Sequence, residues 1–261
     1  MGNRTAICCG SKPRSRKLTN KGKNLFSSVD LHQATSCPPS PASSSAAIYT
    51  TSWNSTEIIR QVETCEQDFY ALIDRTEATP LPLHAQKPGI QIYGTDTSRG
   101  FLMKSVWTST FSPETVLAFA QNNFLRLSWD PNLAERRTIG CVTEQIRITY
   151  ERYKKILGVA QRDMLSAGKM CRLRDGSLLD WSVSVEIAEI PVVQDVIRAH
   201  LYLGGYHIQA TPQGSLIALY NEVNYGGALP NKLLVPMSAR TMLSFVQSFN
   251  TALAQSNCLA I

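Results

Sequence analysis

Residues 196–227, which read VIRAHLYLGGYHIQATPQGSLIALYNEVNYGG, decide the fold of this chain. Two segments of this stretch, 196–209 and 214–225, are rich in Val, Ile, Tyr and Thr, a composition that predicts β-strands. Their short connection predicts that they pair antiparallel. The same composition predicts five strands upstream, at 90–94, 101–110, 139–150, 162–173 and 178–188. We therefore expect a long run of antiparallel strands.

Helices with one apolar face are predicted before, within and after the strand segments. The first begins with a capping-box pattern at 54–57, and its apolar residues recur at spacings of four and three until about Thr76. A second begins at the Ser-Pro-Glu of 112–114, which is typical of a helix start. The last helix closes the chain, and Pro236 is expected to kink or restart it. Its apolar face consists of Met242, Phe245, Val246, Phe249 and Leu253.

The composition is that of a globular protein with a polar tail. Of 261 residues, 43% are hydrophobic and 18% are charged. Residues 36–52, SCPPSPASSSAAIYTTS, are typical of a linker. We expect a tail and linker over 1–51 and one domain over 52–257, long enough for an ample core. Seven scattered cysteines without a Cys-x-x-Cys pair predict reduced thiols, and neither a metal site nor a cofactor is expected.

The net charge of the chain lies entirely in the tail. Residues 1–47 hold seven Lys or Arg and one acid, a net charge of +6 that equals the net charge of the whole chain. The remainder holds 19 basic and 19 acidic residues and is neutral. This distribution favours an anionic membrane surface as the partner of the tail, and no nucleic-acid partner is expected.

The N-terminus meets the chemical requirements for acylation. Gly2 follows the initiator Met, as N-myristoylation requires, and Cys8 and Cys9 are placed for S-palmitoylation. Stable anchoring needs two such signals, or one acyl chain and a basic run. Ala6 departs from the usual Ser or Thr, so a basic N-terminus that merely begins Met-Gly is the alternative. Acylation predicts the cytosolic face of the plasma membrane or an endomembrane, and its absence predicts the cytoplasm.

Six short motifs follow one another along the chain: Trp129-Asp130, Arg162-Asp163, WSVSV at 181–185, VIRA at 196–199, GGYHI at 204–208 and GALP at 227–230. In this order and spacing they resemble the START domain, the steroidogenic acute regulatory protein-related lipid transfer family, over about residues 52–257. The resemblance implies an α+β helix-grip fold, in which a curved antiparallel sheet wraps around the C-terminal amphipathic helix. It also implies that one lipid lies in a tunnel between them.

The resemblance also implies which residues meet the lipid. Met242, Phe245, Val246 and Phe249 would form the apolar wall contributed by the last helix, with a plain core face as the alternative. Glu151 would be a buried polar group for a headgroup or hydroxyl, with a solvated glutamate at a strand end as the alternative.

The chain departs from the family pattern near the expected ligand. Family members built around a charged pair carry an Arg six residues after the Arg-Asp motif, but Gly168 stands here, with Lys169 beside it. Asn224 replaces the usual Asp before the Gly-x-Leu-Pro turn. The resemblance therefore does not imply a sterol site built on that pair. Arg162-Asp163 is expected to form a structural ion pair, with ligand binding as the alternative.

No sequence pattern indicates catalysis, because nothing supplies a nucleophile, base and orienting group, or a phosphate-binding loop. His200 and His207, seven residues apart on one predicted strand, are expected on opposite faces. We expect a non-enzymatic, monomeric, membrane-tethered protein that binds a lipid and transfers it between membranes. A sterol, phospholipid, sphingolipid or fatty acid would each suit it. A tethered lipid sensor or scaffold is the alternative, and a helix-grip cyclase or hydrolase is a less favoured one.

Overall fold

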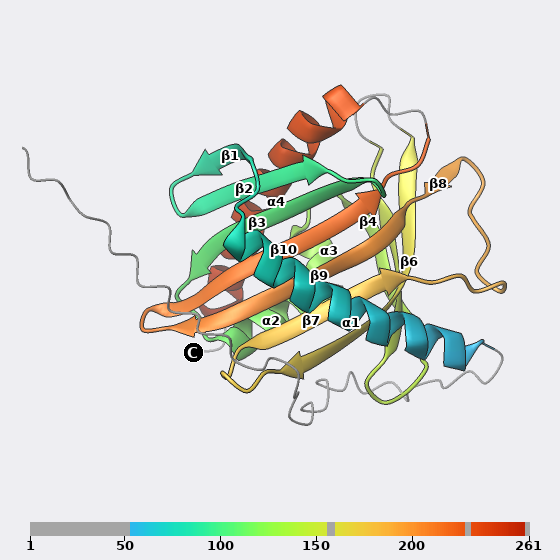
Figure 1. Ribbon diagram of the computed structural model, residues 1–261, viewed down its shortest axis with the longest axis horizontal. Helices are drawn as coiled ribbons and strands as arrows, with labels where there is room; N and C mark the ends of the chain where they lie inside the picture. Colours follow the sequence, from blue (N-terminus) through green and yellow to red (C-terminus); the bar gives the residue numbers. More distant parts are fainter. Residues whose placement is uncertain (1–52, 156–159, 228–230, 259–261) are drawn as a thin grey trace, which may run out of the picture. The chain divides into compact units, whose positions relative to one another are not determined.

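In the computed structural model, which describes residues 53–155, 160–227 and 231–258, ten strands form one sheet (Figure 1). The strand order is β1-β2-β3-β10-β9-β7-β6-β5-β4, every neighbouring pair is antiparallel, and β8 pairs parallel with β6. The strands are β1 Leu83–Lys87, β2 Ile90–Asp96, β3 Phe101–Ser109, β4 Leu133–Cys141, β5 Arg147–Tyr153, β6 Gln161–Arg172, β7 Leu178–Ser184, β8 Val196–Arg198, β9 His200–Thr211 and β10 Gly214–Asn224.

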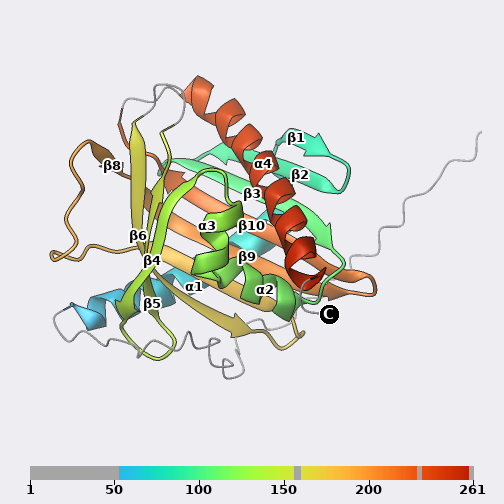
Figure 2. The ribbon, with the colours of Figure 1, turned by 180° about the vertical axis from the view of Figure 1, so that it is seen from behind.

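The helices lie on both faces of the sheet. They are α1 Ser55–Ala78, α2 Pro113–Gln121, α3 Asn123–Trp129 and α4 Asn231–Cys258. We call the face crossed by α1 the outer face, and α2, α3 and α4 lie on the opposite, inner face (Figures 1 and 2). A curved antiparallel sheet with a long C-terminal helix on its inner face is the helix-grip arrangement, so the expected fold is confirmed.

Some predicted features lie beyond this description. The tail 1–51, its boundary with the domain, and Gly2, Cys8 and Cys9 are outside the described residues. Within the ranges that are described, no helix combines the length and the apolar character needed to span a bilayer.

Helix α1 approaches the outer face closely where the sheet carries a glycine. Phe69 is fully buried over Gly205, where an added Cβ would lie 2.7 Å from the Phe69 ring and 2.2 Å from the Asp180 carbonyl oxygen. The indole N–H of Trp181 donates to the backbone carbonyl of Val62 in α1 over 2.9 Å. Because a larger residue at this position would push the two layers apart, the helix and the sheet depend on this glycine for their close packing.

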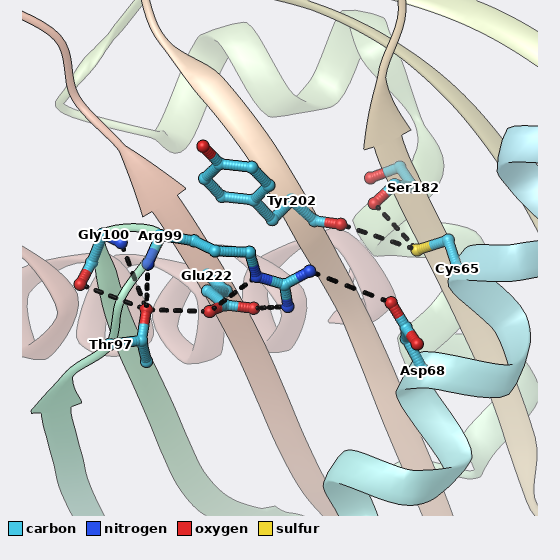
Figure 3. Close-up of polar contacts among 8 residues, drawn as sticks. All are labelled: Cys65, Asp68, Thr97, Arg99, Gly100, Ser182, Tyr202 and Glu222. Carbon is cyan, nitrogen blue, oxygen red and sulfur yellow. Dashed lines mark hydrogen bonds and ion pairs between the residues drawn. The ribbon is translucent and has the colours of Figure 1, made fainter.

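A network of charges fastens the β2–β3 turn to the outer face (Figure 3). Arg99 in the turn pairs with the buried carboxylate of Glu222 in β10 and lies 3.9 Å from Asp68 in α1. Thr97 also donates to Glu222, over 2.8 Å, and the Arg99 guanidinium lies over the Tyr202 ring at 5.0 Å. The network therefore joins the turn, a central strand and the helix.

One predicted strand is wrong because it contains a turn. The segment 139–150 is not continuous but forms the end of β4, a turn at 142–146 and the start of β5. In this turn the Thr143 hydroxyl accepts hydrogen bonds from the backbone N–H groups of Gln145 and Ile146, at 3.2 and 3.1 Å. A threonine reads as a strand former in the sequence, whereas here its side chain stabilises a turn.

Other boundaries differ by smaller amounts. The predicted strand 196–209 is interrupted at Ala199, where β8 leaves β6 and β9 begins, and the predicted strand 178–188 ends at Ser184. The predicted first and last helices are present. Helix α4 is continuous through Pro236, so the predicted restart is absent.

The predicted placement of the two strand histidines on opposite faces is wrong. The pairing of β9 with β10 shifts between Glu222 and Val223, so Tyr202 forms a bulge. A bulge adds one residue to a strand and reverses the alternation beyond it. His200 therefore lies opposite Asn224 and His207 opposite Ala218, two residues of β10 that share the outer face.

Replacing the buried aromatic ring of α1 tests its packing. Phe69→Ala should lower the free energy of unfolding by about 3–5 kcal/mol, because it leaves a cavity over Gly205. Gln67→Ala, at an exposed position of the same helix, should change it by less than about 0.5 kcal/mol. Urea unfolding followed by tryptophan fluorescence measures both. A loss below about 1 kcal/mol for Phe69→Ala would show that α1 contributes little to the core.

The buried histidine predicts a dependence of stability on pH. Burial lowers the pKa of His207 from 6.5 to about 4, so the folded protein keeps this ring neutral at a pH where the unfolded chain protonates it. Stability should therefore fall as the pH decreases from 6.5 towards 4, by up to roughly 3 kcal/mol from this group. His207→Gln should flatten the dependence over this interval, and His200→Gln at an exposed position should not. Equal slopes for the wild type and His207→Gln would contradict the assignment.

Candidate functional site

A cavity of about 280 Å³ lies between the inner face of the sheet and α4. Its apolar lining residues are Met103, Met164, Leu201, Leu219, Val223, Met242 and Phe245. The lining also carries charged and phenolic groups: Arg126, Asp130, Arg136, Arg147, Glu151, Tyr153, Asp180 and Tyr206. Small-molecule sites in proteins commonly combine an apolar wall with a few convergent polar groups, so this cavity is the candidate site.

The predicted apolar face of α4 divides between the cavity and the core. Met242 and Phe245 line the cavity. Val246 and Phe249 are fully buried and do not belong to its lining; the Phe249 ring packs against Trp107, with centroids 5.8 Å apart. Successive turns of one helix therefore meet different neighbours, and lipid contact by Met242 and Phe245 stays a prediction.

Glu151 lies in the cavity lining and is not a solvated residue at a strand end. Its side chain is 17% exposed and lies opposite Arg136 of β4 in the strand register. The Arg136 Nε and Glu151 Oε1 atoms are 3.2 Å apart, and the Tyr153 hydroxyl donates to Oε2 over 2.8 Å. Burial raises the pKa of this carboxyl, but Arg136, Arg126 and the Tyr153 hydroxyl outweigh it, so the pKa lies below its ordinary value.

Two more ion pairs lie in the lining. In α3, the Nε of Arg126 donates to Oδ2 of Asp130, one helical turn later, over 3.0 Å. Arg147 of β5 lies 3.1 Å from Oδ1 of Asp180 in β7, and Gln121 donates to the same oxygen over 3.2 Å. Burial raises the pKa of Asp180 even though Arg147 lies beside it.

Another arginine lies opposite the position at which the family pattern has one. Gly168 of β6 lines the cavity and pairs directly with Arg147 of β5, which also belongs to the lining and pairs with Asp180. Lys169 lies on the outer face, where its ammonium is 6.0 Å from the centroid of the Trp181 ring. Only the strand register, and not the sequence pattern, reveals that Arg147 lies beside Gly168.

The expected ion pair within Arg162-Asp163 is wrong, because neighbouring residues of a strand face opposite sides. Asp163 is fully buried and accepts two hydrogen bonds from Arg198, at 2.7 and 3.1 Å. Arg162 lines the cavity and donates to the backbone carbonyls of Ala160, Tyr225 and Gly226. The alternative reading, ligand binding, thus remains open for Arg162 alone.

The remaining reactive side chains lie elsewhere. Within the described residues, no group of histidine, cysteine and carboxylate side chains could hold a metal ion, and the cavity lining contains neither histidine nor cysteine. Burial raises the pKa of the Cys65 thiol in α1 to about 12, which makes it a poor nucleophile. His207 contacts the Ser177 hydroxyl at 3.3 Å on the outer face, away from the cavity.

Sequence reasoning identified Glu151, Met242 and Phe245 but missed the arginines that surround the carboxylate. Arg126 follows the helix predicted to begin at 112–114, and Arg136 lies ahead of the strand predicted from 139. Neither arginine was therefore predicted to be a site residue. A signal was present, since an arginine four residues before an aspartate on a helix indicates an ion pair.

Comparison with known proteins identifies the family. The START domain model matches residues 60–260, from within α1 to beyond α4. Human StAR-related lipid transfer protein 5 superposes with a TM-score of 0.71 at 16% identity, over 77% of this chain and 99% of that one.

Two further structures share the fold. Human STARD10 has a TM-score of 0.64 at 20% identity, over 72% of this chain and 79% of that one. A STAR-related lipid transfer protein from Xanthomonas axonopodis has a TM-score of 0.58 at 15% identity, over 66% of this chain and 98% of that one. No curated protein matched in a sequence comparison. Because the family model covers most of the sequence, the chain belongs to the START domain family.

Proposed function

We propose that this protein binds one lipid molecule in the inner cavity and transfers it between membranes. The observation that carries the proposal is the cavity of about 280 Å³, whose lining combines apolar side chains with paired charges. Membership in the START domain family and the fold shared with proteins described as lipid transfer proteins support it.

The physical task is to keep a lipid tail out of water. Each methylene group costs about 0.8 kcal/mol to expose, so a long acyl chain costs on the order of 10 kcal/mol. Met242, Phe245 and Leu219 offer an apolar surface that replaces water around the tail. In this proposal α4 and the neighbouring loops separate to admit the lipid and close over it.

A binding and transport role fits the chemistry of the lining better than catalysis. The buried carboxylates are engaged in ion pairs, as Asp130, Glu151 and Asp180 each have an arginine partner. Such groups orient a ligand, whereas covalent catalysis needs a nucleophile with an adjacent base. The proposed function is therefore non-enzymatic.

We further propose that the tail anchors the protein to the cytosolic face of a membrane. Gly2, Cys8, Cys9 and the basic run supply two acylation signals and an electrostatic one, and all lie outside the described residues. As a flexible coil, a 47-residue tail reaches roughly 35–40 Å. A tethered protein would then exchange lipid across a close membrane contact. The alternative is a sensor or scaffold that holds its lipid without transfer.

Filling the cavity tests whether it is the lipid site. Met242→Trp should reduce the molar ratio of co-purified lipid severalfold, because the larger ring occupies space that the tail needs. Ser244→Trp, at an exposed position on the same helix, is the matched control and should leave the ratio unchanged. Native mass spectrometry of the intact protein measures both, with circular dichroism to verify folding. Unchanged lipid occupancy in Met242→Trp would exclude this cavity as the site.

Release of the bound lipid to acceptor vesicles distinguishes a transfer protein from a sensor. The wild-type protein, loaded from donor vesicles that carry a fluorescent lipid, should deliver that lipid to acceptor vesicles, and Met242→Trp should deliver less. Retention of the lipid in the presence of excess acceptor vesicles would favour the sensor or scaffold instead.

The anchor is tested by removing its chemical requirements. Gly2→Ala should release the protein from membranes, because myristoylation needs an N-terminal glycine. Cys8→Ser with Cys9→Ser should leave weak, salt-sensitive binding through one acyl chain and the basic run. Membrane fractionation at low and high salt measures both. If Gly2→Ala stays fully membrane-bound, the acylation proposal is wrong.

A further inference from the structure

The charges that line the cavity do not balance. Among the described residues, the lining contains three carboxylates and five cationic side chains: Arg126, Arg136, Arg147, Lys154 and Arg162. The three carboxylates each pair with one arginine of this set. An excess of two positive charges therefore remains in the lining, which also contains apolar side chains.

The two extra cations have only neutral partners in the described part of the chain. Arg162 donates to three backbone carbonyls, and the Lys154 ammonium donates to the carbonyl of Pro131 over 3.0 Å. Neither forms an ion pair with a described carboxylate. Backbone carbonyls satisfy the donors of the buried Arg162 but do not neutralise its charge, so the electrostatic cost of that charge remains, whereas Lys154 is exposed to solvent.

Arg136 is also only partly compensated. Its Nε lies 3.2 Å from Glu151, yet this buried N–H is not directed at the oxygen and has no hydrogen-bond acceptor. Its Nη1 donates to the backbone carbonyl of Ala120 over 3.3 Å. Burial lowers the pKa of Arg136 below its ordinary value in spite of the neighbouring carboxylate. A buried donor without an acceptor costs free energy, which a ligand that accepts from it would recover.

We propose that the ligand is a lipid with an anionic head, a carboxylate or a phosphate monoester, and that Arg136 donates to this head. The inference rests on the proposed function, since it names the lipid class for the same cavity. The head would lie beside Arg136 in the lining, to which Arg162 adds buried positive charge without a carboxylate partner, and the chain would extend along apolar lining residues such as Met242 and Leu219. A neutral alcohol could accept the hydrogen bond but could not offset the charge.

Three probes with the same chain separate the head chemistries. Dodecanoate, dodecyl phosphate and dodecanol should be titrated into the full-length protein after removal of co-purified lipid. At about pH 8 both anionic heads are charged, and one or both anions should bind about 10–100-fold more tightly than dodecanol. This ratio of affinities corresponds to the net free energy of one charge-assisted hydrogen bond. The stronger of the two anions identifies the head as carboxylate or phosphate.

Substitutions on β4, β5 and β6 test which side chains produce the preference for anions. Arg136→Gln combined with Glu151→Gln removes both charges together and leaves no unpaired buried carboxylate, so the preference for the anions should fall severalfold, to the part that Arg162 still supplies. Arg137→Gln changes the next residue, whose side chain is 59% exposed, and should keep the full preference. Arg162→Gln leaves the Arg136–Glu151 pair intact and should weaken anion binding severalfold, which covers the case in which the double variant fails to fold.

The outcomes distinguish this inference from the proposed function. Dodecanol binding as tightly as both anions would overturn the inference but leave lipid binding in place. So would an unchanged preference in both the double variant and Arg162→Gln. Failure of all three probes to bind, in a protein that also purifies without lipid, would overturn the proposed function as well.

Discussion

The ion pair between Glu151 and Arg136 is the constraint on which the candidate site depends. A carboxylate in the inner face of a sheet is costly unless positive charge and hydrogen bonds surround it. The register of β4 against β5 places Arg136 directly opposite, and the Tyr153 hydroxyl completes the arrangement. Removing one partner alone would leave a buried charge, so the pair also fixes how the strands bounding the cavity meet.

The two faces of the sheet have different tasks. The outer face is packed tightly, with Phe69 of α1 against Gly205 and the Trp181 indole bonded to the α1 backbone at Val62. The inner face keeps a cavity of about 280 Å³ under α4. Because interiors normally pack as densely as organic crystals, a space of this size needs a rigid wall to persist. The packing of α1 supplies that wall from behind.

Helix α4 combines both tasks in one element. Val246 and Phe249 are fully buried and anchor the helix, while Met242 and Phe245 lie one turn earlier and line the cavity. A helix anchored at one end and bordering a cavity at the other suits the proposed opening, since only the part over the cavity has to separate from the sheet. The charged residues of the lining lie mainly on α3 and the strands β4 to β7.

The sequence by itself determined the order of elements, the antiparallel strands and the terminal amphipathic helix, because these follow from composition and local periodicity, whereas Glu151 was suggested only by the family resemblance. Only the tertiary structure decided which charges meet. Arg136 faces Glu151, and Arg147 lies opposite Gly168, through cross-strand registers that no local pattern encodes. The bulge at Tyr202 likewise reversed the predicted faces of a strand. Side-chain direction along a strand alternates, so a single inserted residue changes every later assignment.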